Sequence, residues 1–532
     1  MGRERNIRIL VSDSLEQLLV DVLAREGFEV DNRPGIPAEE LKEVIPEYDG
    51  LVVRSSTRVT AEVIGRAARL KVIGRAGTGV DNIDVDAATR RGILVMNTPG
   101  GNTVSAAEHT VSMLLSLARN IPQANRSLVR GEWERKKFIG IEVQEKTLGV
   151  IGLGKIGREV ARRCLGLDMR VVAYDPLLSS EVAAKANIEL VELDELYRRA
   201  DFITVHTPLT PQTKGLLNDE TLGKCRRGVR IINCARGGIV DEHALLRALE
   251  SGQVGGAALD VFETEPPGKS ELISHAHVVC TPHLGASTEE AQEKIAVQLA
   301  QQLADALHGR GYAGIVNATA IQLSVREDVK PYLSLAEKMG SLVAQLTFGK
   351  INQVTVVASG EVVVSSIDLL KAGILKGILS QLYPDPVNVV NAPLLARDMG
   401  LVVSEYRDQV GESFANMLGI RYEAGGQAKE VAGTVFGPST PRLVKLDAFR
   451  FEVRPEGFLL IYNNIDRPGM LARVGLVLAK HNVNIAGVSL GRVAAGESAL
   501  TVMNIDSGIP HSGLQELLAQ EGISNLRLVR LE

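Results

Sequence analysis

The sequence has few of the residues that mark extracellular or membrane proteins. Only four of its 532 residues are cysteine, and their spacing fits neither a disulfide framework nor a CxxC metal site. No apolar run reaches the roughly 18 residues of a membrane span. The N-terminal segment also lacks the apolar stretch of a secretory signal. We therefore expect a cytoplasmic protein with reduced thiols, no metal site and no membrane contact.

The chain also lacks an excess of basic residues. Lysine and arginine together number 59 against 64 for aspartate and glutamate, which gives a net charge of −5. Proteins that bind the phosphate backbone of nucleic acids need a basic surface, so nucleic acid is not an expected partner. Hydrophobic residues make up 45% and charged residues 23%, as in folded globular proteins. At roughly 100–200 residues per domain, this length predicts several domains.

Short β-branched runs alternate with amphipathic segments in the first part of the chain. This alternation predicts a parallel sheet with crossover helices. We place a small α/β lobe at residues 1–98. A strong helical pattern at 288–307 suggests that residues 283–316 return to pack on this lobe. The strands are expected at 7–11, 51–53, 72–73 and 93–96, and the helices at 15–25 and 61–68.

Residues 99–282 predict a second parallel sheet. A helix begins after Asn102, and six apolar runs follow at 148–151, 170–173, 202–205, 230–232, 257–259 and 278–280. Beyond residue 317 the pattern changes, and residues 317–452 mix strands and helices. The final segment, 455–532, has the order βαββαβ of a ferredoxin-like unit, with a hairpin turn at Ala495-Gly496.

A glycine-rich turn opens the second α/β series. Gly152, Gly154 and Gly157 follow a predicted strand and precede a predicted helix, as a dinucleotide-binding turn requires. The glycines let the backbone approach a pyrophosphate at the N-terminus of the helix. Asp175 ends the next strand and is placed to accept hydrogen bonds from an adenosine ribose. A carboxylate there repels a 2′-phosphate, so we expect NAD rather than NADP.

Polar residues follow several later strands of the same sheet. They include Arg236, Asp260, Glu265 and His283. Ligands bind outside the carboxyl ends of parallel strands, so these residues are expected to converge on one crevice. A histidine takes a hydroxyl proton, a glutamate orients the imidazole, and an arginine grips a carboxylate. This combination suits hydride transfer from a hydroxy acid.

These motifs together resemble the D-isomer-specific 2-hydroxyacid dehydrogenases over about residues 50–315. The resemblance is carried by Gly152–Gly157 with Asp175, Cys234–Gly238, Asp260, Glu265-Pro266-Pro267, Pro282–Gly285, and Arg54 with Gly74–Asn82. It implies an α/β fold of two Rossmann-like lobes, one for substrate and one for nucleotide. It implies Arg236, Glu265 and His283 as the catalytic residues. The implied dinucleotide contacts are Thr78, Gly152, Gly154, Lys155, Ile156, Gly157, Asp175, Thr207, Cys234, Ala235, Asp260 and Gly285.

The expected substrate carries a carboxylate and a phosphate. Arg236 and the amides of the turn at Gly77 suit the carboxylate, and Arg54 and Arg75 are expected to meet the phosphate. The resemblance implies oxidation of 3-phospho-D-glycerate to 3-phosphohydroxypyruvate, the first step of serine biosynthesis. Two alternatives stay open: a reductase of glyoxylate or hydroxypyruvate, and a dinucleotide-sensing corepressor that reuses the fold.

The C-terminal 215 residues resemble the regulatory half of long-form members of this family. Residues 317–452 resemble their α+β intervening domain, and 455–532 resemble an ACT domain. The resemblance implies L-serine binding at Asn464, Asp466 and Asn484, although some relatives carry histidine where Asn464 stands. Arg442, Lys445 and Arg450 are interpreted either as an anion site or as a solvated surface.

One exposed segment is expected to take part in assembly. The resemblance places Trp133 at an interface between the nucleotide domains of a dimer, within a tetramer. We expect Arg135 or Lys136 to reach the partner's active site, with a solvated charge run as the alternative.

Overall fold

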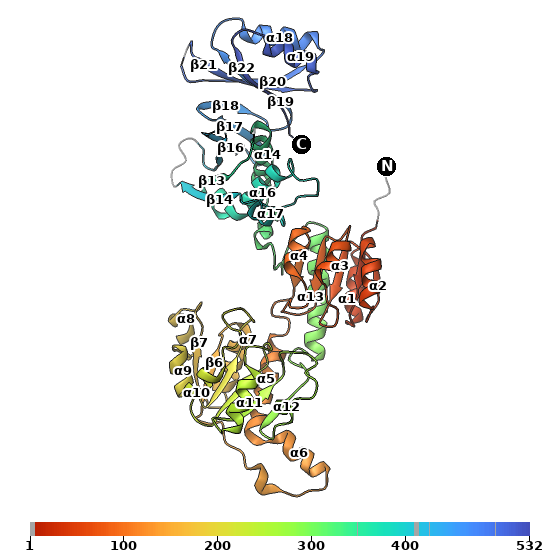
Figure 1. Ribbon diagram of the computed structural model, residues 1–532, viewed down its shortest axis with the longest axis vertical. Coiled ribbons are helices and arrows are strands. Elements are labelled where there is room, and N and C mark those ends of the chain that lie inside the picture. The colour runs from red at the N-terminus through yellow and green to blue at the C-terminus, as the bar shows by residue number, and fades with distance from the viewer. Residues whose placement is uncertain (1–5, 348, 409–413, 425, 495, 532) are drawn as a thin grey trace.

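The computed structural model describes residues 6–347, 349–408, 414–424, 426–494 and 496–531. Within these ranges the chain forms four sheets along an elongated molecule (Figure 1). Ala495 of the predicted hairpin turn lies outside the described residues, as do residues 1–5. No helix in the described ranges has both the length and the apolarity needed to cross a membrane.

The first sheet is parallel, with the strand order β2-β1-β3-β4-β5. Helix α13 packs on one face, where Leu299 and Leu303 share a core with Ile9 of β1. The helix thus lies in the core of the first lobe. Strand β2, with the sequence Glu-Val-Asp-Asn, was not predicted because it lacks an apolar run. The elements are β1 (Arg8–Val11), α1 (Gln17–Arg25), β2 (Glu29–Asn32), α2 (Ala38–Val44), η1 (Ile45–Glu47), β3 (Gly50–Val53), α3 (Ala61–Arg66), β4 (Val72–Arg75), α4 (Val85–Arg90), β5 (Leu94–Asn97) and α13 (Glu289–Leu307).

The second sheet is also parallel, with the order β12-β11-β10-β9-β6-β7-β8. The strand order reverses at β6, which lies between β7 and β9. In open parallel sheets this switch point is where ligands bind, outside the carboxyl ends of the strands. The elements are α5 (Thr103–Arg119), α6 (Ile121–Val129), η2 (Arg135–Phe138), β6 (Thr147–Ile151), α7 (Lys155–Leu165), β7 (Arg170–Tyr174), α8 (Ser180–Ala184), β8 (Glu189–Leu190), α9 (Leu193–Arg199), β9 (Phe202–Val205), α10 (Asp219–Lys224), β10 (Val229–Asn233), α11 (Glu242–Glu250), β11 (Val254–Leu259), α12 (Glu271–Ser274) and β12 (Val278–Cys280).

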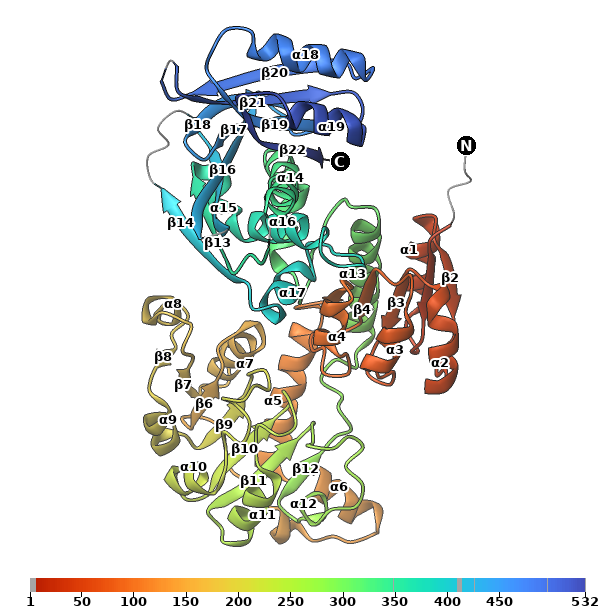
Figure 2. The same cartoon turned by 45° about the horizontal axis from the view of Figure 1, so that its top comes forward.

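The third sheet has the order β14-β13-β15-β16-β17-β18 and is antiparallel except for the pair β13–β14. The two helices α14 and α16 cover it (Figure 2). The elements are η3 (Thr319–Val325), α14 (Lys330–Leu346), β13 (Gln353–Ser359), α15 (Glu361–Ser365), α16 (Ile367–Leu379), α17 (Ala392–Asp398), β14 (Val402–Asp408), β15 (Met417–Ala424), β16 (Gln427–Phe436), β17 (Thr440–Leu446) and β18 (Phe449–Val453).

The fourth sheet confirms the predicted order βαββαβ, with the strands arranged β20-β21-β19-β22. Helices α18 and α19 cover one face, and the other face lies against the third sheet (Figure 1). Here one shared core joins the two sheets, with Val356 and Leu418 on one side and Leu459, Leu500 and Val502 on the other. The elements are β19 (Gly457–Ile465), α18 (Met470–Lys480), β20 (Ile485–Arg492), β21 (Ser498–Ile505), α19 (His511–Leu518) and β22 (Ile523–Leu531).

Hydrogen bonds and an ion pair connect the segment that contains α17 to the first lobe. The Asn388 Nδ2 atom donates to the Gly92 carbonyl oxygen at 2.9 Å, and the Asn391 Nδ2 atom donates to the Arg90 carbonyl oxygen at 3.4 Å. Arg90 also forms an ion pair with Asp398 at the end of α17. These contacts place α17 beside α4 (Figure 2). We call them the asparagine latch.

Candidate active site

The glycine-rich turn between β6 and α7 is shaped by close backbone contacts. Gly152 has a φ of 92°, and a Cβ atom there would lie 2.7 Å from the His206 carbonyl oxygen. A Cβ atom on Gly157 would collide with the Gly152 carbonyl oxygen. Gly154, by contrast, faces open space and caps α7 without a side-chain hydrogen bond. The first amides of α7 are thus left for an anion, as a dinucleotide pyrophosphate requires.

Two side chains beside this turn also fit a dinucleotide. The Asp175 carboxylate accepts hydrogen bonds from the amides of Leu153 (2.8 Å) and Leu177 (2.9 Å), which fix it at the end of β7. The Thr207 hydroxyl is buried without a hydrogen-bond partner among the described residues. A buried hydroxyl seldom stays unpaired, so this atom marks a place for a ligand group. The residues present therefore fit NAD.

His283 and Glu265 form a direct pair at the carboxyl ends of the strands. The His283 Nδ1 atom lies 2.7 Å from Glu265 Oε2, and Glu265 Oε1 accepts from the Phe262 amide at 3.1 Å. Burial alone would raise the pKa of Glu265. The hydrogen bond and charge of His283 outweigh that effect, so the pKa of Glu265 is lowered from 4.5. The Nε2 atom of His283 is left for a reactant.

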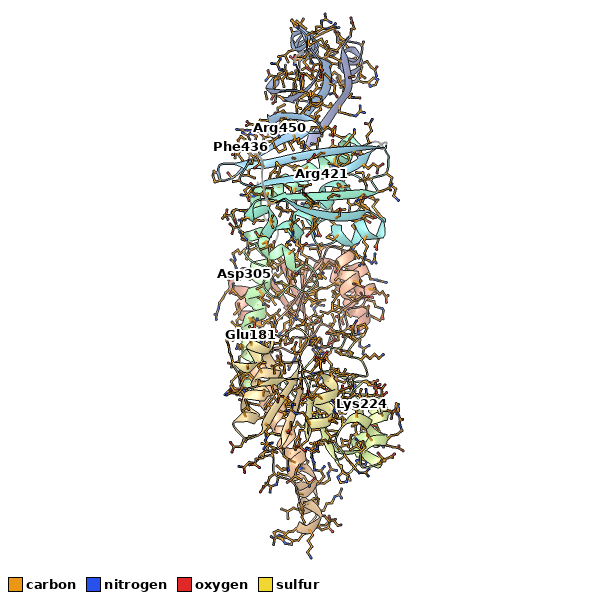
Figure 3. The ribbon with its side chains drawn as sticks, turned by 90° about the vertical axis from the view of Figure 1, so that its left-hand side faces the viewer. Glu181, Lys224, Asp305, Arg421, Phe436 and Arg450 are labelled. Carbon is orange, nitrogen blue, oxygen red and sulfur yellow. The ribbon has the colours of Figure 1, made fainter. Side chains whose placement is uncertain are left out.

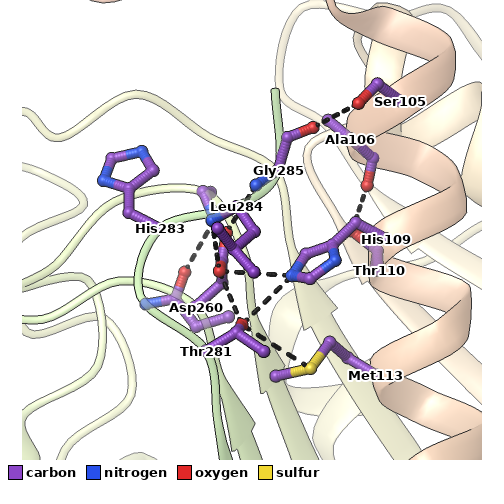
Figure 4. A network of polar contacts seen from close by, with 12 residues as sticks. Ser105, Ala106, His109, Thr110, Met113, Asp260, Thr281, His283, Leu284 and Gly285 are labelled. Atoms are coloured by element: carbon purple, nitrogen blue, oxygen red, sulfur yellow. Dashed lines mark hydrogen bonds and ion pairs between the residues drawn. The ribbon is translucent and has the colours of Figure 1, made fainter. Parts of the chain in front are cut away.

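Asp260 lies behind the loop that carries His283. Its side chain is fully buried, and its oxygens accept from Thr281 Oγ1 (2.6 Å) and from the amides of Leu284 (2.7 Å) and Gly285 (2.9 Å). On the far side, His109 Nε2 of helix α5 lies 3.2 Å from Asp260 Oδ1 and 3.1 Å from Thr281 Oγ1 (Figure 4). His109 could not be identified from the sequence, because one histidine within a helical pattern carries no chemical signal.

The charge of Asp260 is stabilised by this network. Burial alone would raise its pKa, but the hydrogen bonds from His109, Thr281 and the Leu284 amide lower it below 3.8. The main chain of Asp260 takes part as well, because its carbonyl accepts from the His283 amide at 2.9 Å. His283 adopts a positive φ of 56°, which these contacts hold in place. Asp260 therefore shapes the loop of the candidate base.

Arg236 follows β10 and lies across from the first lobe. Its Nε atom donates to Asp81 Oδ2 at 3.0 Å, and its Nη1 atom donates to the Ala235 carbonyl oxygen at 2.6 Å. The adjacent Gly237 packs so closely on the Phe262 carbonyl that a Cβ atom would overlap it. This packing sets the arginine loop beside the loop that carries Glu265. Asp81 belongs to the Gly74–Asn82 motif, but its contact with Arg236 was not predicted from the sequence.

Arg75 lies near both Arg236 and Arg54. Arg75 Nε donates to Asn82 Oδ1 at 2.7 Å, and Arg75 Nη1 donates to the Gly79 carbonyl at 2.6 Å. Burial lowers the pKa of Arg75, and the positive charges of Arg236 and Arg54 lower it further. Arg75 is thus close enough to both Arg236 and Arg54 to repel them, and the three positive charges together favour a bound anion. Arg54 lines a small cavity with Glu16, Ala76 and Gln292.

The remaining predicted contacts lie around the same crevice. The Thr78 hydroxyl donates to Asn102 Oδ1 at 3.0 Å, and the Gly77 amide donates to Thr98 Oγ1 at 3.0 Å. Burial raises the pKa of the Cys234 thiol to about 12, so it stays protonated near pH 7. Lys155 Nζ reaches the Pro99 carbonyl at 3.5 Å, and Ile156 packs against the core of the second sheet.

The three predicted serine contacts engage separate partners. Asn464 is buried, accepts from Thr501 Oγ1 at 2.8 Å and donates to the Ile465 carbonyl. Asp466 pairs with Arg492 at 3.1 Å, and Asn484 Nδ2 donates to Asp506 at 2.7 Å. No hydrogen bond joins any two of the three within the described residues.

The basic residues of the third sheet are matched by carboxylates. Arg442 pairs with Glu452 at 3.1 Å, and Lys445 pairs with Glu430 at 2.7 Å. Figure 3 shows Arg421 and Arg450 on the same sheet. The pairing of Arg442 and Lys445 favours the solvated surface over an anion site, because their charges are already compensated.

Helix α6 and the segment after it expose an unusual amount of apolar surface. The exposed fraction is 57% for Leu128, 79% for Val129, 77% for Trp133 and 79% for Ile139. We call residues 121–139 the α6 arm. Its tip extends away from the second sheet (Figure 1). Exposed apolar surface of this kind is typical of an interface.

Comparisons with known proteins agree with this geometry. The model of the D-isomer specific 2-hydroxyacid dehydrogenase NAD-binding domain matches residues 111–285. The D-3-phosphoglycerate dehydrogenase intervening domain matches 328–447, and the ACT domain matches 458–522.

Whole-chain relatives and solved structures extend the comparison. D-3-phosphoglycerate dehydrogenase of Synechocystis sp. is 44% identical over 98% of this chain and 95% of its own length. The human protein of that name is 43% identical over 94% of this chain and 96% of its own. The solved D-lactate dehydrogenase of Aquifex aeolicus, complexed with NAD and lactic acid, is 29% identical with a TM-score of 0.51. It covers 57% of this chain and 96% of its own. This chain belongs to the D-3-phosphoglycerate dehydrogenases, within the NAD-binding D-isomer specific 2-hydroxyacid dehydrogenases.

Proposed function

We propose that the chain oxidises 3-phospho-D-glycerate at C2 to 3-phosphohydroxypyruvate. The observation that carries this proposal is the His283–Glu265 pair, together with Arg75 and the two arginines that lie close to it, Arg54 and Arg236. The relatives that match over nearly their whole length bear the name of this activity. The crevice thus combines a base for the hydroxyl proton with positive charge for the two anionic ends of the substrate.

Each residue contributes a distinct part of the reaction. His283 takes the C2 hydroxyl proton as the hydrogen on C2 leaves with its electron pair, and Glu265 stabilises the imidazolium that forms. Arg236 binds the substrate carboxylate and polarises the new carbonyl. NAD bound at the glycine-rich turn supplies the acceptor of the electron pair. The reverse reaction, followed as loss of NADH, is favoured near neutral pH because oxidation releases a proton.

The substrate assignment is tested by comparing oxo acids. We expect NADH oxidation with 3-phosphohydroxypyruvate and at least tenfold lower kcat/KM with glyoxylate, because glyoxylate lacks a phosphate for Arg54 and Arg75. Substitution of Arg54 by alanine is expected to reduce this preference. Efficient turnover of glyoxylate alone would instead support a glyoxylate reductase. Binding of NADH with no turnover of any oxo acid would support the corepressor alternative.

We further propose L-serine as an effector of the ACT domain, through Asn464, Asp466 and Asn484. The ACT match supports a small-molecule effector site, and the carboxylate of the partly exposed Asp466 is suited to an ammonium group. Inhibition of NADH oxidation by millimolar serine, lost in Asp466→Ala, is the expected result. An unchanged rate at saturating serine would contradict it.

We also propose how the chain assembles. The α6 arm supports pairing of nucleotide domains, and we expect a tetramer by light scattering that weakens when Trp133 is replaced by glutamate. Arg135 or Lys136 is proposed to reach the partner's active site.

The four sheets and their cores support domain limits of 1–98 with 283–316, 99–282, 317–452 and 455–532. A cytoplasmic location fits the absence of a membrane-spanning helix among the described residues.

A further inference from the structure

A single ion pair joins the candidate carboxylate-binding arginine to the opposite lobe. Arg236 belongs to the loop after β10 in the second sheet, and Asp81 belongs to the loop after β4 in the first sheet. The Arg236 Nε atom lies 3.0 Å from Asp81 Oδ2. The contact therefore forms only when the two lobes approach each other. It ties the orientation of Arg236 to the relative position of the lobes.

The contacts of Arg236 leave its two terminal nitrogens available for a ligand. A guanidinium group has five N–H donors, one on Nε and two on each Nη atom. Asp81 takes the Nε donor, and the Ala235 carbonyl takes one donor of Nη1. Nη2 lies against Gly79, where a Cβ atom would overlap it. The Nη1 and Nη2 edge, which bridges both oxygens of a carboxylate, therefore faces the turn that begins at Gly77.

The strength of this ion pair argues for orientation rather than stability. The Asp81 side chain is 61% exposed and that of Arg236 is 28% exposed. Exposed ion pairs contribute little to folding, so loss of Asp81 is expected to leave the fold intact. The local charge makes its effect on Arg236 larger, because the positive charge of Arg75 repels that side chain. The other nearby carboxylate, Asp13, is occupied by the amides of Arg54, Ser56 and Thr57.

We propose that Asp81 is a positioning residue that sets the carboxylate specificity of the crevice through Arg236. It holds the Nε edge, and so it directs the terminal nitrogens of Arg236 to the substrate carboxylate. Gly79 provides the space in which the guanidinium lies. This inference rests on the proposed role of Arg236 as the group that binds the substrate carboxylate.

The first test compares substitutions of Asp81 in the full-length protein. We expect Asp81→Ala to raise the KM for 3-phosphohydroxypyruvate at least tenfold, with a smaller fall in kcat and an unchanged Kd for NADH. Asp81→Asn keeps an acceptor oxygen without the charge, so an intermediate KM is expected, and Asp81→Glu is expected to restore part of the loss. Asp86→Ala removes an exposed carboxylate from the nearby helix α4 and serves as the matched control. A KM within twofold of the parent in Asp81→Ala would overturn the proposal.

The second test separates Asp81 from the function of Arg236 itself. Lysine has no Nε edge and no fork, so Arg236→Lys is expected to lower kcat/KM by itself. In the Arg236→Lys background, Asp81→Ala is expected to have almost no further effect on KM. If the two substitutions instead change KM independently, so that their effects multiply in the double variant, the proposed role of Asp81 would be overturned. The proposed role of Arg236 would not be affected. An Arg236→Lys variant with parental kinetics would overturn the proposed function of Arg236.

Discussion

Two carboxylate–histidine pairs lie on either side of the loop 281–285, and they differ chiefly in exposure. In the pair His109–Asp260 the side chains are 18% and 0% exposed. In the pair His283–Glu265 they are 45% and 38% exposed. The buried Asp260 carboxylate accepts hydrogen bonds from the loop, whereas in the exposed pair the Nε2 atom of His283 stays free. Burial thus suits the first pair, which Figure 4 shows, to holding the loop, and exposure suits the second pair to proton transfer.

The largest expected effect follows from removing the exposed histidine. His283→Asn eliminates the group that exchanges the hydroxyl proton, so kcat is expected to fall about 10³-fold, within the usual range for general acid–base catalysis. The midpoint of thermal unfolding is expected to change little, because the side chain is half exposed. NADH binding, followed by fluorescence, serves as the control. Retention of a tenth or more of the activity would remove His283 from the role of base.

Substitution of the buried carboxylate is expected to affect stability most. Asp260→Asn replaces one carboxylate oxygen with an NH₂ group. This group cannot accept a hydrogen bond from the backbone amide of Leu284 or Gly285 that it then faces. We expect a loss of about 3 kcal/mol in the free energy of unfolding, because buried donors lose their acceptor. The measurement is urea denaturation of the parent and the variant.

The same variant has a predicted pH dependence. The pKa of Asp260 is lowered in the folded state, so its stabilisation is complete above 3.8 and is lost as the pH falls below that value. The difference in unfolding free energy between parent and Asp260→Asn is therefore expected to be largest near neutral pH and to shrink in acid. A difference that grows in acid would contradict this sign.

Substitution of the exposed carboxylate is expected to have a smaller and purely catalytic effect. Glu265→Gln keeps a hydrogen-bond acceptor for His283 Nδ1 but removes the charge that favours the imidazolium. We expect kcat for reduction to fall about 30-fold, or about 2 kcal/mol in activation free energy. The pH at which reduction declines is expected to move toward acid. The pH–rate profile measures both kcat and the pH of this decline. An unchanged profile would show that the charge of Glu265 does not affect protonation of His283.

The smallest effect is expected for the buried histidine. His109→Leu removes one hydrogen bond to the Asp260–Thr281 pair and is expected to cost about 1 kcal/mol of stability. We expect kcat to stay within threefold of the parent, because Asp260 retains the loop amides. His109→Gln, which preserves a donor, is the control and is expected to recover most of the stability. A fall in kcat comparable to that of His283→Asn would erase the distinction between the two pairs.

The candidate residues at the edge of the second sheet could be identified from the sequence, because they follow β strands in a parallel sheet. Gly152 and Asp260 stand directly after an apolar run and His283 follows one after two further residues, and the topology of such sheets places these positions on one edge. The order βαββαβ of the last segment was predicted for a similar reason, because its turns are marked by glycine and asparagine.

Contacts that depend on the packing between elements were not predicted. His109 lies on a helix, and only the position of α5 over β11 and β12 brings it to Asp260. Asp81 meets Arg236 through the relation of two lobes that no local pattern encodes. The antiparallel strands β15–β18 were not identified individually, because their residues Met417–Val453 are rich in charge and alternate weakly.

The shared core between the third and fourth sheets determines where this chain can be divided by protein engineering. A chain ending before β19 would leave Leu443, Leu446 and Val453 without the side chains that cover them, and such a truncation is expected to aggregate. A chain ending just after η3 breaks the asparagine latch, the contacts of Val389 and Val390 with the first lobe, and the packing of η3 against α14 and α16. The D-lactate dehydrogenase that matches 57% of this chain over 96% of its own length shows that a shorter chain with the corresponding lobes exists. The practical fragment therefore ends near residue 326, and the two C-terminal sheets are best moved or removed as one piece.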